Sequence, residues 1–76
     1  MKTCQIKLSS IQDVREFVDI VTGYDIEIDL SSGRYVVDAK SIMGIFSLDL
    51  MNVITLTAHS DDVKDLFEKL DRVIVK

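Results

Sequence analysis

Hydrophobic and polar residues alternate along four short segments of the chain, and this alternation predicts four β-strands. At the start of the chain, the apolar residues Cys4, Ile6 and Leu8 are separated by polar ones, which is the period of a strand with one buried face. The same period recurs in three later segments. Their apolar positions are Tyr24, Ile26, Ile28 and Leu30 (residues 24–30), Val37 and Ala39 (35–39), and Ile54, Leu56 and Ala58 (53–58).

A first amphipathic helix is predicted over residues 11–22, where apolar residues recur at spacings of three and four. Ser10 and Asp13 have the spacing of a capping pair at its start. Gly23 is suited to ending it, because glycine accommodates the backbone that follows a last helical turn. The apolar stripe of this helix consists of Val14, Phe17, Val18 and Val21.

A second amphipathic helix is predicted after the fourth strand. Ser60 is the expected N-cap, and Asp61 and Asp62 fall in the first turn, where acidic side chains suit the helix dipole. Its apolar stripe consists of Val63, Leu66, Phe67, Leu70 and Ile74.

Two features lie between these elements. Ser41 can cap a short helix that runs to about Leu48, and Gly33 can adopt a positive φ in a turn over residues 31–34. The order is therefore βαββαβα over a single domain, residues 1–76. Helices packed on one face of an antiparallel sheet bury all the apolar faces together, so the pattern predicts an α+β open-faced β-sandwich.

Composition narrows the classes of function. The chain has 76 residues, 47% of them hydrophobic, which suits one small folded core. Its net charge is −4 and it has no basic run, so we expect no nucleic-acid partner. The single cysteine, Cys4, excludes an internal disulfide, and we expect it to pack in the core. Without a long apolar span or an apolar leader, we expect a cytoplasmic protein with no membrane insertion.

The segment Lys-Ser-Ile-Met-Gly-Ile-Phe-Ser-Leu at residues 40–48 resembles the regulatory-serine segment of HPr. HPr is the small phosphocarrier of the bacterial phosphoenolpyruvate sugar phosphotransferase system (PTS). In that family the serine opens a short helix and is phosphorylated by a dedicated kinase, so the resemblance implies this role for Ser41. It also implies the HPr fold, with a four-stranded antiparallel sheet. Finally, it implies that Ile42, Met43 and Phe46 belong to a docking surface for enzyme I and other partners.

The second signature of the family, a Gly-x-His-Ala-Arg-Pro loop after the first strand, has no counterpart in this chain. Counting back from Tyr24, the resemblance places Ser10 at the phosphocarrier histidine, Gln12 at the loop arginine and Asp13 at the helix-opening proline. A phosphoserine ester does not keep the transfer potential of a phosphoimidazole, so Ser10 would be a dead end for relay. We therefore expect no catalytic residue and no histidine phosphotransfer.

His59 is the only histidine in the chain. It follows the fourth strand, and the resemblance makes the first and fourth strands antiparallel neighbours. The strand ends next to Ser10 and His59 should then lie at opposite edges of the sheet. We expect an ordinary turn histidine rather than a carrier. No spacing of His and Cys suits a metal site, and no cofactor is expected.

The sequence leaves two interpretations open for the segment after Lys40. Ser41 can be a structural N-cap, which stabilises a helix by about 1 kcal/mol, or a phosphorylation site beside free backbone N–H groups. Ile42, Met43 and Phe46 can form the underside of the short helix or a partial apolar patch for partners. We predict that Met43 and Phe46 are exposed contacts.

Three functions are compatible with these observations. The first, which we favour, is a regulatory or adaptor protein rather than an enzyme. It would be a monomer that docks onto PTS enzymes, an HPr kinase or a transcriptional regulator, with Ser41 as a switch. The second is an active phosphocarrier with a non-standard acceptor. The third is an interaction or small-ligand module outside the PTS that keeps only the fold.

Overall fold

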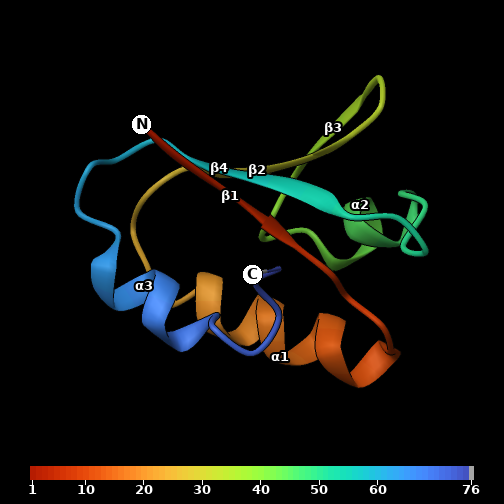
Figure 1. Cartoon of the computed structure of the whole chain (residues 1–76), viewed down its shortest axis with the longest axis horizontal. Coiled ribbons are helices and arrows are strands. Elements are labelled where there is room, and N and C mark those ends of the chain that lie inside the picture. The colour runs from red at the N-terminus through yellow and green to blue at the C-terminus, as the bar shows by residue number, and fades with distance from the viewer. Residues whose placement is uncertain (76) are drawn as a thin grey trace.

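A computed structural model describes residues 1–75 of the chain. Within these residues the predicted order βαββαβα is confirmed. Figure 1 shows the strands as one layer, with α1 and α3 beneath one of its faces. The elements are β1 (Lys2–Ile6), α1 (Ile11–Val21), β2 (Ile28–Ser32), β3 (Tyr35–Asp38), α2 (Ile42–Phe46), β4 (Ile54–Ala58) and α3 (Lys64–Lys69).

The sheet is antiparallel with the strand order β1-β4-β2-β3. β4 therefore lies between β1 and β2, and its Ala58 is opposite both Lys2 of β1 and Ile28 of β2. β2 and β3 are joined by a two-residue turn in which Gly33 has a φ of 59°. This confirms the turn predicted at Gly33, since a glycine at the first central position suits a hairpin turn of type II′.

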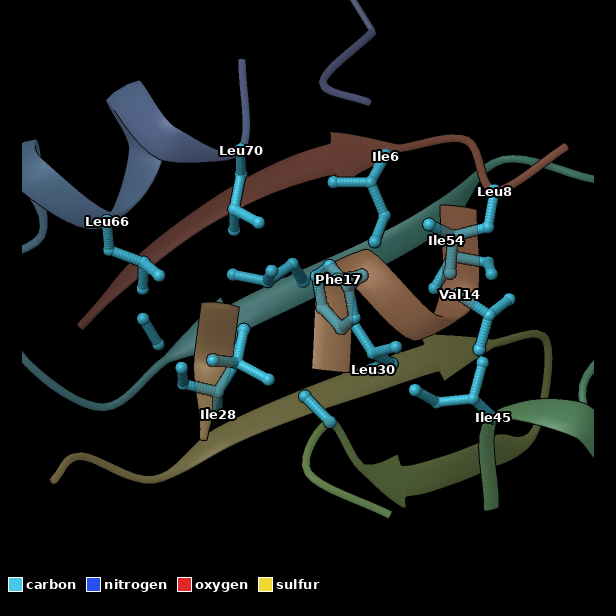
Figure 2. Packing of buried hydrophobic residues seen from close by; sticks show 14 of the residues in the cluster. Ile6, Leu8, Val14, Phe17, Ile28, Leu30, Ile45, Ile54, Leu66 and Leu70 are labelled. Atoms are coloured by element: carbon cyan, nitrogen blue, oxygen red, sulfur yellow. The ribbon is translucent and has the colours of Figure 1, made fainter. Parts of the chain in front are cut away.

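The core lies between the sheet and the helices, as Figure 2 shows for side chains of the strands, α1 and α3. Alternate residues of β2 and β4 point into it, and Phe17 of α1 is only 2% exposed among them. The alternation in the sequence therefore identified the buried faces correctly. The buried residues are Ile6, Leu8, Val14, Phe17, Val21, Ile28, Leu30, Ala39, Ile45, Leu48, Ile54, Leu56, Ala58, Val63, Leu66 and Leu70.

The second strand begins four residues later than the alternation predicted. Tyr24 is held away from the sheet, because its hydroxyl donates to Asp65 at 2.6 Å and its carbonyl accepts from Lys40 Nζ at 2.7 Å. The chain reaches β4 only at Glu27, whose carbonyl accepts from the His59 N–H at 2.9 Å. Contacts of Tyr24 with residues later in the chain thus overrode the local strand pattern.

The last helix also begins later than predicted, and Ser60 is not its N-cap. The Ser60 hydroxyl instead accepts from the Asp62 N–H at 3.1 Å in a local turn. Asp61 pairs with the N-terminal amine of Met1 at 2.8 Å. α3 starts at Lys64 after Val63, which makes no side-chain cap bond. The three polar residues therefore build the turn before the helix rather than its first turn.

Ile74 was predicted to lie on the apolar stripe of that helix, and this was wrong. It lies in a tail beyond α3 that pairs with β1 by a bridge between Ile6 and Ile74. Lys7 N–H donates to the carbonyl of Val73 at 2.8 Å, and Val75 N–H donates to the carbonyl of Gln5 at 2.8 Å. The tail therefore covers part of the outer side of β1.

Candidate functional site

Two segments far apart in the sequence border an open groove of about 580 Å³. One side consists of residues 7–11, which connect β1 to α1, and the other consists of Phe46 and residues 48–51, which end and follow α2. In Figure 1 the start of α1 and α2 lie at the same end of the molecule. We refer to this feature as the Ser10–Phe46 groove.

The lining of the groove is mainly apolar. Leu8 and Leu48 are buried, whereas Ile11, Phe46 and Met51 are 67%, 42% and 85% exposed. Large apolar side chains that stay exposed around a concave surface are typical of protein interaction sites. The groove therefore has the chemistry to accept an apolar side chain of a partner.

Lys7 links the two sides of the groove. Its ammonium donates to the carbonyl of Leu50 at 3.3 Å and also to the carbonyl of Met51. These bonds satisfy two carbonyls of the turn after α2 and place that turn beside β1. The cation thus fixes the position of the loop that carries the exposed Met51.

Ser10 is the N-cap of α1, as predicted. Its hydroxyl accepts from the Asp13 N–H at 3.1 Å, and the Asp13 carboxylate accepts from the Ser9 N–H at 3.1 Å. This arrangement resembles a capping box with Asp in place of Glu, except that the Asp13 carboxylate accepts from the N–H of Ser9, the residue before the cap, and not from that of Ser10. The Ser10 oxygen therefore already serves a structural role at the first turn of α1.

The neighbours of Ser10 do not supply a guanidinium from the positions that the resemblance assigned. Gln12 donates through its side-chain amide to Glu16 at 3.1 Å. Asp13 lies 3.2 Å from Arg72, which also pairs with Glu16. The arginine that comes from beyond α3 is thus held by two carboxylates of α1. Electrostatically, the start of α1 presents a partly neutralised carboxylate next to Ser10.

Ser41 is the N-cap of α2, again as predicted. Its partly buried hydroxyl accepts from the Gly44 N–H at 3.1 Å. A Cβ on Gly44 would lie 3.3 Å from both the Ser41 Oγ and the Val37 Cβ, so this glycine allows α2 to pack closely on β3. Met43 and Phe46 are 77% and 42% exposed, as expected, and Ile42 is 37% exposed, whereas the role of these residues as partner contacts stays a prediction.

The structure brings only part of the predicted site together. Ser10 and Phe46 line the same groove, whereas Ser41, Ile42 and Met43 are not part of its lining. Sequence reasoning missed Ile11 and Met51, which are on its rim. Ile11 stands three residues before Val14 and so looks like a core residue, yet it lies at the exposed first position of α1.

His59 lies at the other end of the sheet from Ser10. It follows Ala58, which is opposite Lys2, whereas Ser10 follows the end of β1 at Ile6, which is opposite Ile54. The four residue steps of β4 alone span roughly 13 Å. His59 Nε2 is 2.7 Å from the Asp29 carboxylate, and the two side chains are 38% and 41% exposed. The expected separation is therefore confirmed.

Three further observations on residues 1–75 concern the Cys4 thiol, metal binding and membrane-spanning helices. Cys4 packs against the core, and burial raises the pKa of its thiol. No group of His, Cys, Asp and Glu side chains within these residues could hold a metal ion. No helix in this part of the chain is long and apolar enough to cross a membrane.

Comparison with solved structures places the fold among HPr proteins. HPr-C-His from Thermoanaerobacter tengcongensis is 29% identical over 95% of this chain and 89% of that chain, with a TM-score of 0.80. The phosphocarrier protein HPr from Bacillus anthracis str. Ames is 24% identical over 95% of both chains, with a TM-score of 0.73. Crh, the Bacillus subtilis catabolite repression containing protein, is 22% identical over 93% of this chain and 88% of that chain, with a TM-score of 0.65.

Sequence comparison leads to the same family. No curated protein matches the sequence. The family model PTS-HPr, described as the PTS HPr component phosphorylation site, matches residues 12–76. The matched region begins just after Ser10 and Ile11, and it includes Ser41 and all of α2. With this match over most of its length and the HPr fold, the chain belongs to the HPr family of the phosphotransferase system.

Proposed function

We propose that this chain is a regulatory docking protein of the HPr family that does not carry phosphate on histidine. The observation that supports this most directly is the composition of the Ser10–Phe46 groove. A serine, rather than a histidine, lies on the side formed by residues 7–11, and the rim carries the exposed apolar side chains of Ile11, Phe46 and Met51. Such a site suits binding better than phosphoryl relay.

The chemistry of the two candidate acceptors supports the loss of transfer. The Ser10 hydroxyl oxygen is engaged as the cap of α1, and a phosphate ester on it would not pass its phosphoryl group onward. His59 is the only histidine, and it follows the end of β4 far from Ser10. A partner that docks at the groove would not reach it.

The proposed partner is a cytoplasmic protein that inserts apolar side chains into the groove, in the manner of a helix in a hydrophobic groove. PTS enzymes, an HPr kinase and a transcriptional regulator are the partner classes that the family suggests. The exposed Ile11, Phe46 and Met51 would act as the central contacts. Lys7 would act indirectly, by holding the turn that carries Met51.

Ser41 is the proposed switch. A phosphate on its oxygen could accept from the Gly44 N–H, which the hydroxyl now binds, and it would lie at the positive end of α2. The added negative charge would adjoin the exposed Met43. Binding of a partner over α2 would change because the partner would have to accommodate that charge.

Two parallel reactions followed by intact mass spectrometry test the loss of transfer. One contains phosphoenolpyruvate and enzyme I, the other ATP and HPr kinase, and Ser41→Ala accompanies both. We expect no acid-labile phosphate in the first reaction and one phosphate in the second that Ser41→Ala abolishes. An acid-labile phosphate in the first reaction would restore a carrier role, and loss of that phosphate in His59→Ala would identify the acceptor.

Calorimetric titration with each PTS protein tests the docking surface. Phe46→Ala and Met51→Ser should each weaken binding by about tenfold, which corresponds to the loss of roughly 1.4 kcal/mol at a central contact. Val53→Ser is the matched control, because Val53 is as exposed as Phe46 but does not line the groove. Equal effects of all three substitutions would argue against this surface.

A further inference from the structure

The edge strand β3 presents backbone hydrogen-bonding groups along the outer side of the sheet. The carbonyl of Ile28 accepts from the Ala39 N–H at 2.9 Å. Along a strand, alternate residues direct their backbone groups to the same side, so Val37 and Tyr35 also direct theirs toward β2. The N–H and C=O of Val36 and the N–H of Asp38 therefore point outward. None of the described strands pairs with this side of β3.

The two edges of the sheet differ in how they are protected. The outer side of β1 is paired with residues 73–75. The hairpin of β2 and β3 instead projects away from α1 and α3 in Figure 1. Its Tyr35 and Val36 are 69% and 65% exposed. Exposed β-branched and aromatic residues on a free edge favour pairing with another strand.

The charges that flank this edge are complementary to those of a second copy. We propose that two copies of this chain pair through β3 in an antiparallel arrangement whose two-fold axis passes through Val36. In that register Val36 faces the partner's Val36, and Arg34 faces the partner's Asp38. The two-fold axis repeats this pair at the other end of the paired strands, so each dimer contains two ion pairs between Arg34 and Asp38.

Side-chain alternation agrees with this register. Arg34, Val36 and Asp38 lie two residues apart and so occupy one face of the strand. The two ion pairs would therefore flank the contact between the two Val36 side chains. On the other face, Tyr35 would lie opposite the partner's Val37. One Asp38 carboxylate oxygen accepts from the Lys40 N–H at 2.9 Å, and in the dimer the other would accept from the guanidinium of the partner's Arg34.

The assembly is one continuous antiparallel sheet with the helices of both copies on the same side. A four-residue edge gives a small interface, and small interfaces are characteristic of weak, transient complexes. We therefore expect a dissociation constant on the order of 0.1–1 mM. This dimer departs from the monomer expected from the sequence, and it does not depend on the proposed docking function.

Sedimentation velocity over a concentration series up to about 1 mM at low salt tests the proposal, since salt screens the ion pairs. We expect a reversible dimer. Val36→Pro should abolish it, because proline removes the outward N–H and leaves the bonds to β2 intact. A wild-type chain that stays monomeric, or a dimer unchanged by Val36→Pro in a folded variant, would overturn the proposal.

Charge reversal provides a second test that does not rely on the proline variant. Arg34→Glu places two carboxylates opposite each other at both ends of the dimer, and Asp38→Lys places two cations there. Each variant alone should dimerise about tenfold more weakly. An equimolar mixture restores both ion pairs and should form the mixed dimer. If the mixture associates no better than the separate variants, the proposed register is wrong.

Discussion

The hydroxyl of Tyr24 donates a 2.6 Å hydrogen bond to the carboxylate of Asp65 and so ties the loop before β2 to the first turn of α3. Lys69 lies one helical turn further on, 3.7 Å from the same carboxylate and 5.4 Å from the centre of the Tyr24 ring. The bond raises the pKa of the Tyr24 phenol and lowers the pKa of the Asp65 carboxyl.

Tyr24→Phe is expected to lower the free energy of unfolding at neutral pH and to flatten its pH dependence. The lowered pKa of the Asp65 carboxyl adds stability at pH values above 3.8, its ordinary pKa. This stability is lost as pH falls through the lowered pKa. The raised pKa of the Tyr24 phenol adds stability at pH values below 10.0, its ordinary pKa. This stability is lost as pH rises through the raised pKa. Urea unfolding over a pH series measures both effects. Tyr35→Phe, at an exposed tyrosine, is the control and should leave the profile unchanged.

Ser41→Ala is expected to destabilise the protein by about 1 kcal/mol, because it removes the acceptor for the Gly44 N–H at the start of α2. Ser41→Asp should keep most of the stability, since aspartate is an equally good N-cap. Urea denaturation of the three proteins gives the comparison. Equal stability of the alanine variant and the wild type would show that the cap contributes nothing measurable.

The periodicity of apolar residues was sufficient to predict the fold, because a sheet with helices on one face buries the apolar face of each strand and the apolar stripe of each long helix together. It was less informative about where elements begin. Tyr24 and Ile26 continue the alternation of β2 and pack against the core, but the Tyr24 hydroxyl is bound to Asp65, 41 residues later in the chain. Such a long-range contact leaves no local signature around Tyr24.

The candidate site was predictable only in part for a similar reason. The caps at Ser10 and Ser41 are local features with a short-range signal, and both were predicted. The groove, by contrast, forms because the loop after β1 comes to lie beside the turn after α2, through Lys7 and the carbonyl of Met51. Lys7 looked like an ordinary polar residue of an alternating strand, so its role in this contact could not be inferred from periodicity.

Gly33→Ala is expected to destabilise the protein by about 1–2 kcal/mol. Gly33 has a φ of 59°, where a Cβ approaches the following carbonyl, and no neighbouring atom would contact the new Cβ, so backbone strain is the dominant cost. Gly33→Asn should cost less, since asparagine tolerates this conformation better. Thermal unfolding of both variants measures the difference, and equal losses would contradict this explanation.

The Cys4 thiol is expected to be alkylated slowly in the folded protein. Burial raises its pKa above the ordinary value of 9.0, so less thiolate is present near neutral pH, and the side chain is also half shielded. The rate of reaction with iodoacetamide should rise when urea unfolds the chain. A rate that is the same with and without urea would mean that the strand opens readily.

The pairing of β1 with β4 determines when the sheet can be completed. β2 and β3 are joined by a two-residue turn, but residues 2–6 find their partners only at residues 54–58. During synthesis on a ribosome, β1 would emerge early and wait until β4 had been made. Formation of such distant contacts closes a long loop, which slows folding relative to local hairpins. We therefore expect the β2–β3 hairpin to form first and the docking of β1 to be the late step of folding.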